Sequence, residues 1–503
     1  MSPTSRTNAD GKLGSRRIAA HSRRERRTTL LAAARLAVPL ALGLLAAGCS
    51  TLSSVEHTLF GGGNEPAAGQ PGFVTGFIGE VVAEEPRAAL AGKEVLSGGG
   101  SAADAAVAVA MSLAVTLPSR AGLGGGGACL AYTVDRNKAA KGVPEAILFV
   151  PPPVRSVGGG DRPAAVPMLA RGMFLLHARH GRLRFEPLVE KAEQLARFGV
   201  PVSTALARDL ALVAGPLFAD PAARAVFGPS GVPLVQGQGL LQPDLAATLA
   251  QLRVAGVGDL YLGVMARKVE QVSPSAGVPI GIADLQAALP SIAAPVLVPF
   301  GDESVAFPPT EGGVGAAAAF MSLKAQPTDA QAAFARSIAA AERWRLGGAN
   351  SDQVLNSQLA APAAVPLYPA STTFATLDPD GNAVVCALTM NNLFGTGRIV
   401  PGLGFLAAAS PTTVTPPLLA MALAWNGHSF HAETGGSGQA GASLAAAAAL
   451  STALRSGQPM QTPVPDPGRA TAIICPRYLP GSESACAAAS DPREFGLATG
   501  GGS

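Results

Sequence analysis

The sequence predicts an α+β protein in which pairs of β-strands alternate with buried helices in layers. Three observations support this fold class: Ala-rich helical stretches, short β-like runs joined by turn residues, and a hydrophobic content of 48% over 503 residues. That content supports a large core, in one big domain or in two or three ordinary ones. The 60 glycines and 42 prolines predict many turns and closely packed small residues.

The first 48 residues have the order of a secretory signal: a basic stretch, an apolar run from Leu36 to Ala47, and then small residues. The segment Leu45-Ala46-Ala47-Gly48-Cys49 resembles a bacterial lipobox, so we expect Cys49 to be the lipidated first residue of the mature chain. Ser50 favours the periplasmic side of the outer membrane. A retained membrane anchor is the alternative, although the apolar run is shorter than the roughly 20 residues that span a bilayer. The arginine pairs fit both Sec and twin-arginine export.

The segment 49–78 is polar and Gly-rich and is predicted to be a flexible tether. The whole chain has a net charge of +3, but the leader alone contributes +7, which leaves −4 for residues 49–503. A slightly acidic body lacks the basic surface of nucleic-acid-binding proteins. The sequence therefore excludes nucleic acid as a partner.

The region 79–370 is predicted to be mainly helical, with an early strand. The Ala-rich run Ser101–Leu117 has Asp104 in its first turn, which predicts a buried helix. Five glycines between Arg120 and Gly127 end this helix, and Ala128–Thr133 is then typical of a strand. Helical patterns dominate from about residue 167 to 308 and return after it; examples are Glu186–Phe198, Pro243–Val254 and Thr328–Leu346.

A Pro- and Ala-rich linker that ends at Ala370 precedes a second region, 371–503, in which β-like runs begin. Thr372–Leu377 and Ala383–Thr389 are predicted strands. Asp378-Pro379-Asp380-Gly381-Asn382 between them is a strong hairpin signal. Ala442–Leu454 is a further Ala-rich helix. We find no internal repeat.

The cysteines have three predicted roles. Cys49 belongs to the lipobox, whereas Cys129 and Cys386 lie in apolar runs and are expected to be small core residues. Cys475 and Cys486 flank a turn-rich segment, so a disulfide between them is expected in an oxidising compartment.

Glycine-rich and polar motifs follow one another in a distinctive order along residues 80–500. They are Gly98–Ala108, Gly122–Gly127, Leu260–Gly263, Asp284-Leu285, Pro308–Gly313, Ser371–Ala383, Thr389–Asn391, Phe394–Gly397 and Ala489–Arg493. In this order they resemble the gamma-glutamyltransferase (gamma-glutamyltranspeptidase) family, and the chain looks like a divergent bacterial member. That family belongs to the N-terminal-nucleophile hydrolases. The resemblance therefore implies a four-layer αββα sandwich, a precursor that cleaves itself, and no cofactor.

The resemblance implies that Ser371 is the nucleophile, in the place of the family's Thr. Cleavage between Ala370 and Ser371 would give a large-subunit region, 79–370, and a small-subunit region, 371–503, that stay associated. A hydroxyl needs an adjacent base. The freed α-amine, with a pKa of about 7.7–8.0, is much closer to neutral than Lys at about 10.4. Taken alone, Ser371-Thr372-Thr373 would fit a polar entry to a strand.

The same resemblance assigns roles to four further residues. Thr389 falls where the family hydrogen-bonds the nucleophile, and Asn391 where it contacts the substrate amino group. Gly435 and Gly436 match the family's oxyanion-hole pair, since two backbone N–H groups at a turn before a helix would receive the negative carbonyl oxygen. An edge strand at 389–391 and a plain glycine turn are the simpler interpretations.

The residues that would recognise glutamate depart from the family pattern. Phe149–Pro153 replaces the Phe-Arg-Glu motif whose Arg holds the glutamyl carboxylate, so Arg155 is the candidate substitute. Thr412 and Thr413 stand for paired serines and keep the hydroxyl donors. The acidic and amide loop, together with the lid, is missing, because Gly404–Ser410 runs almost directly into a proline.

No metal site is expected. His177 and His180, like His428 and His431, are three residues apart but lack a carboxylate in a zinc-protease arrangement. The glycine run 122–127 lacks the Lys-Ser/Thr of a phosphate-binding loop, so we expect a packing turn there.

Three functions fit these features. The first is a gamma-glutamyltransferase-like amidohydrolase or acyltransferase that acts on γ-glutamyl or related small acyl amides through a Ser371 acyl-enzyme. The second is an acylase with non-glutamyl specificity, and the third is a catalytically degenerate surface lipoprotein with a binding role. Each missing charged hydrogen bond is worth about 1.5–3 kcal/mol. We therefore expect poor turnover of γ-glutamyl anilides, and better turnover of acyl anilides that lack the α-amino and α-carboxyl groups.

Overall fold

The computed structural model describes residues 76–134, 142–158, 160–359, 364–460, 463–481, 486–493 and 495–499. The expected signal, the lipidation candidate Cys49 and most of the expected tether lie outside this part. Among the described helices, none combines the length and the apolar content needed to cross a membrane.

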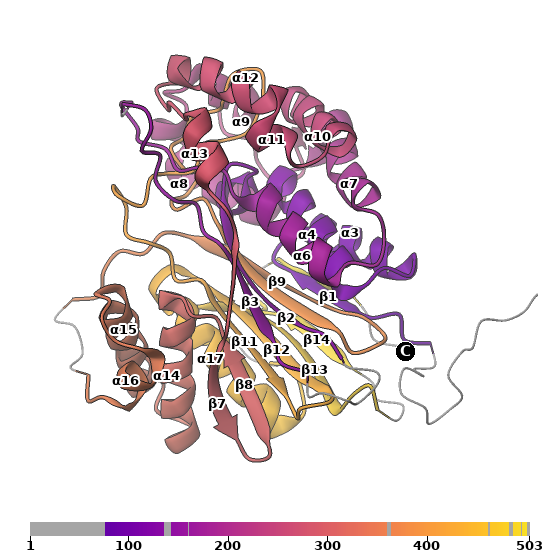
Figure 1. The fold of residues 1–503 in the computed structure, drawn as a ribbon, viewed down its shortest axis with the longest axis vertical. Helices are drawn as coiled ribbons and strands as arrows, with labels where there is room; N and C mark the ends of the chain where they lie inside the picture. Colours follow the sequence, from indigo (N-terminus) through magenta and orange to yellow (C-terminus); the bar gives the residue numbers. More distant parts are fainter. Residues whose placement is uncertain are drawn as a thin grey trace, which may run out of the picture. The chain divides into compact units, whose positions relative to one another are not determined.

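Two antiparallel sheets lie face to face (Figure 1). In spatial order, the first contains β15 (Leu497–Thr499), β1 (Glu80–Ala83), β9 (Ser371–Leu377), β10 (Ala383–Thr389), β2 (Gly126–Tyr132), β3 (Glu145–Phe149) and β6 (Ser291–Ala293). The second contains β14 (Ala487–Ser490), β13 (Arg469–Leu479), β12 (Phe430–Ser437), β11 (Ala420–Trp425), β8 (Glu303–Phe307) and β7 (Val296–Phe300). A separate short ribbon pairs β4 (Val200–Pro201) with β5 (Gly239–Leu240).

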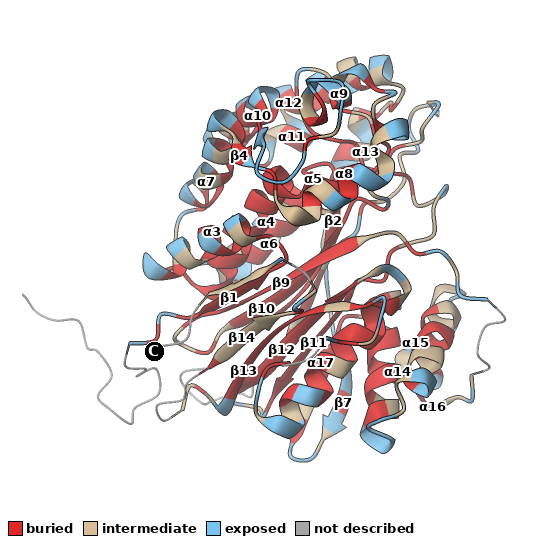
Figure 2. Cartoon of the chain, turned by 180° about the vertical axis from the view of Figure 1, so that it is seen from behind, coloured by how far each residue is buried: buried red, intermediate tan, exposed pale blue. Residues whose placement is uncertain are grey.

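Helices cover the outer face of each sheet (Figures 1 and 2). Those beside the first sheet are α3 (Pro86–Ser97), α4 (Ala102–Thr116), α5 (Pro118–Ala121), α6 (Leu169–His180) and α7 (Phe185–Phe198). The same side continues with α8 (Thr204–Leu217), α9 (Pro221–Phe227), α10 (Pro243–Ala255), α11 (Asp259–Leu262), α12 (Val264–Val272), η1 (Ser273–Ala276) and α13 (Ile282–Ala287). The second sheet is covered by α14 (Glu311–Ala325), α15 (Ala330–Arg345), α16 (Ser351–Asn356) and α17 (Ala442–Ser456), the last preceded by η2 (Gln439–Gly441). The four-layer αββα sandwich is therefore confirmed.

Helix α4 shows how an Ala-rich segment becomes part of the core. It begins with a capping box in which Ser101 and Asp104 each accept the backbone N–H of the other. All 15 of its residues are buried, because it packs on β9 and β10 and is enclosed by α3, α6 and α7. The predicted buried helix at 101–117 is confirmed.

The hairpin between β9 and β10 sets the register of the first sheet. Asp378 accepts hydrogen bonds of 3.0 Å from the N–H groups of Asp380 and Asn382, and Gly381 adopts a φ of 89°. This turn pairs Ser371 directly with Thr389. Both predicted strands and the hairpin between them are confirmed.

The inner faces of the two sheets form an apolar layer that encloses one isolated acid. Glu433 on β12 is fully buried, and neither of its carboxyl oxygens has a hydrogen-bond partner among the described residues. It lies two positions from Gly435, which faces Thr373 of the first sheet, so the Glu433 side chain points to the same inner face. Burial raises the pKa of Glu433 well above its ordinary value.

The structure corrects the expectation for two cysteines. Cys129 and Cys386 are buried, as expected, but they are paired directly across β2 and β10 and form a disulfide. A single sequence gives no sign of this bond, because the two residues are 257 positions apart. The structure also contains the expected disulfide between Cys475 and Cys486.

Candidate active site

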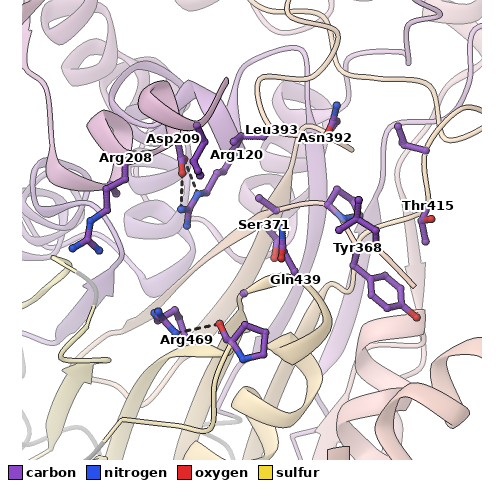
Figure 3. Close-up of a pocket in the computed structure, with 18 of the residues that line it drawn as sticks. Arg120, Arg208, Asp209, Tyr368, Ser371, Asn392, Leu393, Thr415, Gln439 and Arg469 are labelled. Carbon is purple, nitrogen blue, oxygen red and sulfur yellow. Dashed lines mark hydrogen bonds and ion pairs between the residues drawn. The ribbon is translucent and has the colours of Figure 1, made fainter. Parts of the chain in front are cut away.

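Ser371, the first residue of β9, lies in the wall of a cavity of about 570 Å³ (Figure 3). The linker residues Leu367–Ala370 line the same cavity. Tyr368 anchors this linker, since its ring is buried and its hydroxyl donates to Glu342. The peptide bond before Ser371 is thus held beside a space large enough for a small acyl amide.

The Thr389 hydroxyl lies against this peptide bond. It donates a hydrogen bond of 3.4 Å to the carbonyl oxygen of Ala370 and accepts the N–H of Asn391 at 2.9 Å. The contact therefore goes to the carbonyl preceding Ser371, whereas the resemblance implied a bond to the nucleophile itself. A donor on that oxygen makes the carbonyl carbon easier to attack.

Asn391 supports the cavity wall from behind. Its amide nitrogen donates to the carbonyl oxygens of Pro151 and Ala409, at 3.2 and 3.0 Å. It is fully buried, has a φ of 58°, and is absent from the cavity lining, which contains its neighbours Asn392 and Leu393. In this geometry Asn391 fixes the loop and does not face a substrate.

The expectation that Gly435 and Gly436 form the turn before the helix is wrong. Both lie within β12, paired with β11 on one side and β13 on the other. A side chain at position 435 would place its Cβ 2.6 Å from that of Thr373 in the opposite sheet. The first glycine therefore allows the two sheets to approach closely.

The turn itself lies at Gly438–Gly441, and its first two residues line the cavity. Gly438 and Gln439 have φ values of 95° and 54°. The N–H groups of Gln439 and Ala440 donate to no residue that the structure describes. Backbone N–H groups in a turn that leads into a helix suit a negatively charged oxygen. The sequence signal for this turn was the pair of glycines at 438 and 441.

The other expected substrate-binding residues separate into two groups. Thr413 lines the cavity, and its hydroxyl donates to the Ser410 carbonyl at 3.0 Å. Thr412 is exposed and shares a hydrogen bond of 2.9 Å with the Ser410 hydroxyl. Arg155 is exposed, its backbone N–H donates to Asp284, and it is not among the residues lining the Ser371 cavity.

Four arginines that were not predicted from the sequence line the cavity. They are Arg120, Arg208, Arg469 and Arg493. Arg120 forms a two-point ion pair with Asp209, with both N–O distances at 2.8 Å. Asp209 is the acidic residue of this lining, and Arg120 also lies 3.4 Å from a Glu84 carboxyl oxygen, so the charge of Arg120 is compensated.

The remaining arginines are held by contacts at the edge of the cavity. The Arg208 guanidinium stacks on the ring of Phe495, 4.7 Å from its centroid. Arg469 and Arg493 share Asp466, at 3.2 and 2.5 Å. These side chains come from segments far apart in sequence, which is why no local motif indicates them. Arg493 also pairs with Asp491 at 2.8 Å. Among the described residues, Arg208 has no acidic partner, so it is the lining arginine that can attract an anionic ligand.

Within the described part of the chain, no three His, Cys, Asp or Glu side chains are grouped as a metal site. The chemistry available at the cavity is that of hydroxyls, backbone N–H groups and arginines.

This four-layer αββα sandwich, with a hydroxyl residue at the start of a central strand, is the architecture expected of the N-terminal-nucleophile hydrolase class. The sequence model of the gamma-glutamyltranspeptidase family matches residues 88–350, more than half of the chain. The chain belongs to the gamma-glutamyltranspeptidase family.

Two curated relatives indicate the range of this family. Glutathione hydrolase 3 of Arabidopsis thaliana is 26% identical over 394 residues, which cover 68% of this chain and 62% of that protein. The acylase ACY 1 proenzyme of Pseudomonas sp. (strain SE83) is 32% identical over 228 residues, 42% of this chain and 41% of that protein. The chain thus spans less than two thirds of the length of either relative. By their names, the first of these relatives is a glutathione hydrolase and the second an acylase proenzyme.

The fold is shared with a solved structure, the cephalosporin acylase from Bacillus halodurans. The two align with a TM-score of 0.68 over 87% of this chain and 98% of that chain, at 17% sequence identity. At this identity the likeness concerns the fold alone.

Proposed function

We propose that the protein is a self-processing amidohydrolase and acyltransferase with Ser371 as its nucleophile. The observation that carries this proposal is the position of Ser371 at a strand start, where the Thr389 hydroxyl contacts the preceding carbonyl. The Gly438–Gly441 turn adds N–H donors at the same cavity. Proenzyme relatives support a chain that matures by cleavage.

In the proposed maturation, Ser371 Oγ attacks the carbonyl carbon of Ala370. The C–N bond breaks as the C–Oγ ester forms, and the hydroxyl proton passes to the departing nitrogen. Water then hydrolyses the ester. This leaves a carboxylate on Ala370 and a free α-amine on Ser371.

In the proposed turnover, the α-amine of Ser371 accepts the proton of its own hydroxyl as Oγ attacks the acyl carbonyl. The N–H group of Gln439, a residue that lines the cavity, stabilises the negative oxygen. The α-ammonium gives its proton to the leaving amine as the amide bond breaks. Water or an amine then takes the acyl group from the Ser371 ester.

The preferred acyl group, we infer, carries a carboxylate but no neighbouring ammonium. Arg208 presents a guanidinium beside the cavity, whereas Asp209 is already paired with Arg120. An ammonium would thus meet positive charge without an available acid in the lining. This differs from the specificity expected from sequence, which favoured acyl groups without either charge: the α-amino group is still disfavoured, but a carboxylate is now preferred.

A matched series of p-nitroanilides tests this specificity. Glutaryl, pentanoyl and γ-glutamyl anilides differ by a carboxylate and an α-amine on the same carbon skeleton. We expect kcat/KM of the cleaved protein to be roughly 10- to 100-fold higher for glutaryl than for pentanoyl, the equivalent of one charged hydrogen bond. The γ-glutamyl anilide should be the slower of the two charged substrates.

Arg208→Gln should reduce the glutaryl rate toward the pentanoyl rate and leave the pentanoyl rate nearly unchanged. A γ-glutamyl anilide that is preferred by orders of magnitude contradicts the inferred specificity. If fully cleaved protein hydrolyses none of the three, a binding role without catalysis becomes the better account.

We also propose that the protein acts on the periplasmic side of a bacterial membrane, held there by lipid on Cys49. This rests on the leader and lipobox pattern of residues 1–49. The disulfides in the body are compatible with an oxidising compartment.

A further inference from the structure

Glu84 is a buried acid that no step of the proposed mechanism uses. It directly follows β1 and is 1% exposed. Since Ala83 pairs with Phe374, Glu84 lies beside the beginning of β9, the strand that starts with Ser371. It is therefore close to the nucleophile in space, although it is 287 positions away in sequence.

The Glu84 carboxylate collects hydrogen bonds from both sides of the site. Oε2 accepts the Thr372 hydroxyl at 2.8 Å and lies 3.4 Å from Arg120 Nη1. Oε1 accepts the hydroxyls of Ser437 and, at 3.4 Å, Thr373. A buried carboxylate with several donors is well satisfied, so it can hold those donors in one arrangement.

These contacts link the two elements that the proposed chemistry needs. Thr372 directly follows the nucleophile, and Ser437 directly precedes the Gly438–Gly441 turn. Once the bond before Ser371 is cut, β9 loses its covalent connection on that side. Its first residues are then held by the β-ladder and by side-chain contacts such as the Thr372–Glu84 hydrogen bond.

We propose that Glu84 is a positioning residue that holds the nucleophile end of β9 against the oxyanion turn. It touches neither substrate nor the reacting atoms, and it acts through Thr372 and Ser437. This inference rests on the proposed function. Its effect should appear in kcat more than in KM, because misplacement of the attacking group weakens transition-state stabilisation before it weakens binding.

Glu84→Gln is the direct test, with Glu85→Gln as the matched control. Glu85 is the adjacent acid, is also buried at 2% exposure, and caps helix α3 through the N–H of Ala88. In purified, cleaved protein assayed with the glutaryl anilide, we expect Glu84→Gln to lower kcat roughly 10- to 100-fold, with KM changed by less than about threefold. Glu85→Gln should keep kcat within about threefold of wild type.

The single hydrogen bonds can be tested separately with Thr372→Val and Ser437→Ala. Each should lower kcat, and Ser437→Ala should have a smaller effect in the Glu84→Gln background than in wild type. These two variants also test the proposed role of Glu84 if the Glu84→Gln protein does not fold. Equal kcat in wild type and Glu84→Gln, or fully additive effects with Ser437→Ala, would overturn the inference while leaving the proposed function intact. An uncleaved and inactive wild type would overturn both.

Discussion

Two hydroxyl groups meet at the Ala370–Ser371 peptide bond, one on Ser371 and one on Thr389. The first is the proposed attacking group, and the second donates to the carbonyl oxygen. Both residues stand on strands that are paired in register, so a β-ladder and not a loop sets their separation. Such rigid support is what a reacting pair of groups requires.

Thr389→Val should slow cleavage of the precursor. Valine keeps the β-branched shape of the side chain but removes the donor to the Ala370 carbonyl, so the developing negative charge loses one stabilising contact. We expect the rate of cleavage to fall roughly 10- to 100-fold, followed by intact mass over time. Thr376→Val is the control, because Thr376 is buried on the neighbouring strand β9 with its hydroxyl bonded to the Ala102 carbonyl, and it should cleave at close to the wild-type rate. Equal rates in the two variants would contradict a role for the Thr389 hydroxyl.

Residues in continuous motifs were predictable from sequence, and residues assembled from distant segments were not. Ser371 and Thr389 flank a recognisable hairpin, so their pairing follows from its turn residues. Arg208 and Glu84 reach the site from other elements, and only the tertiary fold brings them there. Arg155 was predicted as a substitute because it lies just after Phe149–Pro153, where the family's Arg motif is missing, but it is exposed and lies outside the cavity lining.

At the scale of elements, strand β12 serves two purposes along its length. Gly435 lets the sheets approach, and the first two residues of the turn after Ser437 line the cavity. Helix α17 was predicted correctly from the sequence, but the turn before it was predicted at Gly435 and Gly436. Whether a glycine pair ends a strand or continues it depends on the neighbours β11 and β13, which local sequence does not show.

The isolated acid on β12 should make stability depend on pH. The pKa of Glu433 is raised in the folded state, so its contribution is most favourable below the unfolded pKa near 4.3 and is lost as the pH rises. Glu433→Met should therefore stabilise the protein at pH 8 and stabilise it much less at pH 4.5, where the carboxyl group is protonated in both states to a larger extent. Urea unfolding of the Ser371→Ala precursor at both pH values measures this. A variant that is less stable at pH 8, or a difference independent of pH, would show that Glu433 has a partner.

At the scale of the whole molecule, the two proposed fragments are interleaved. In the first sheet, β9 and β10 of the 371–503 region lie between β1 and β2 of the preceding region. In the second sheet, β11 pairs with β8 across the same division. Cleavage before Ser371 would therefore leave one shared core, whose separation would expose both sheets.

The Cys129–Cys386 disulfide should join the two fragments covalently, because its cysteines lie on opposite sides of the proposed cleavage point. Cleaved protein should run as one band on a non-reducing gel and as two bands after reduction. Replacing Cys129 and Cys386 by Ser should give two bands in both conditions. Replacing Cys475 and Cys486, which both belong to the 371–503 fragment, should leave the wild-type band pattern unchanged in both conditions. Two bands from wild-type protein without reductant would rule out the link, and one band in both conditions would mean an uncleaved chain.

Intact-mass measurement with N-terminal sequencing, on wild-type protein and Ser371→Ala under reducing conditions, is the most direct test of an exposed Ser371 nucleophile. We predict a 133-residue fragment that begins at Ser371 in the wild type, and an uncut chain across this bond in Ser371→Ala, which lacks the attacking hydroxyl. A wild-type chain that hydrolyses anilides while it remains unbroken would contradict this account. So would a new terminus at another residue, or equal cleavage of the Ser371→Ala variant.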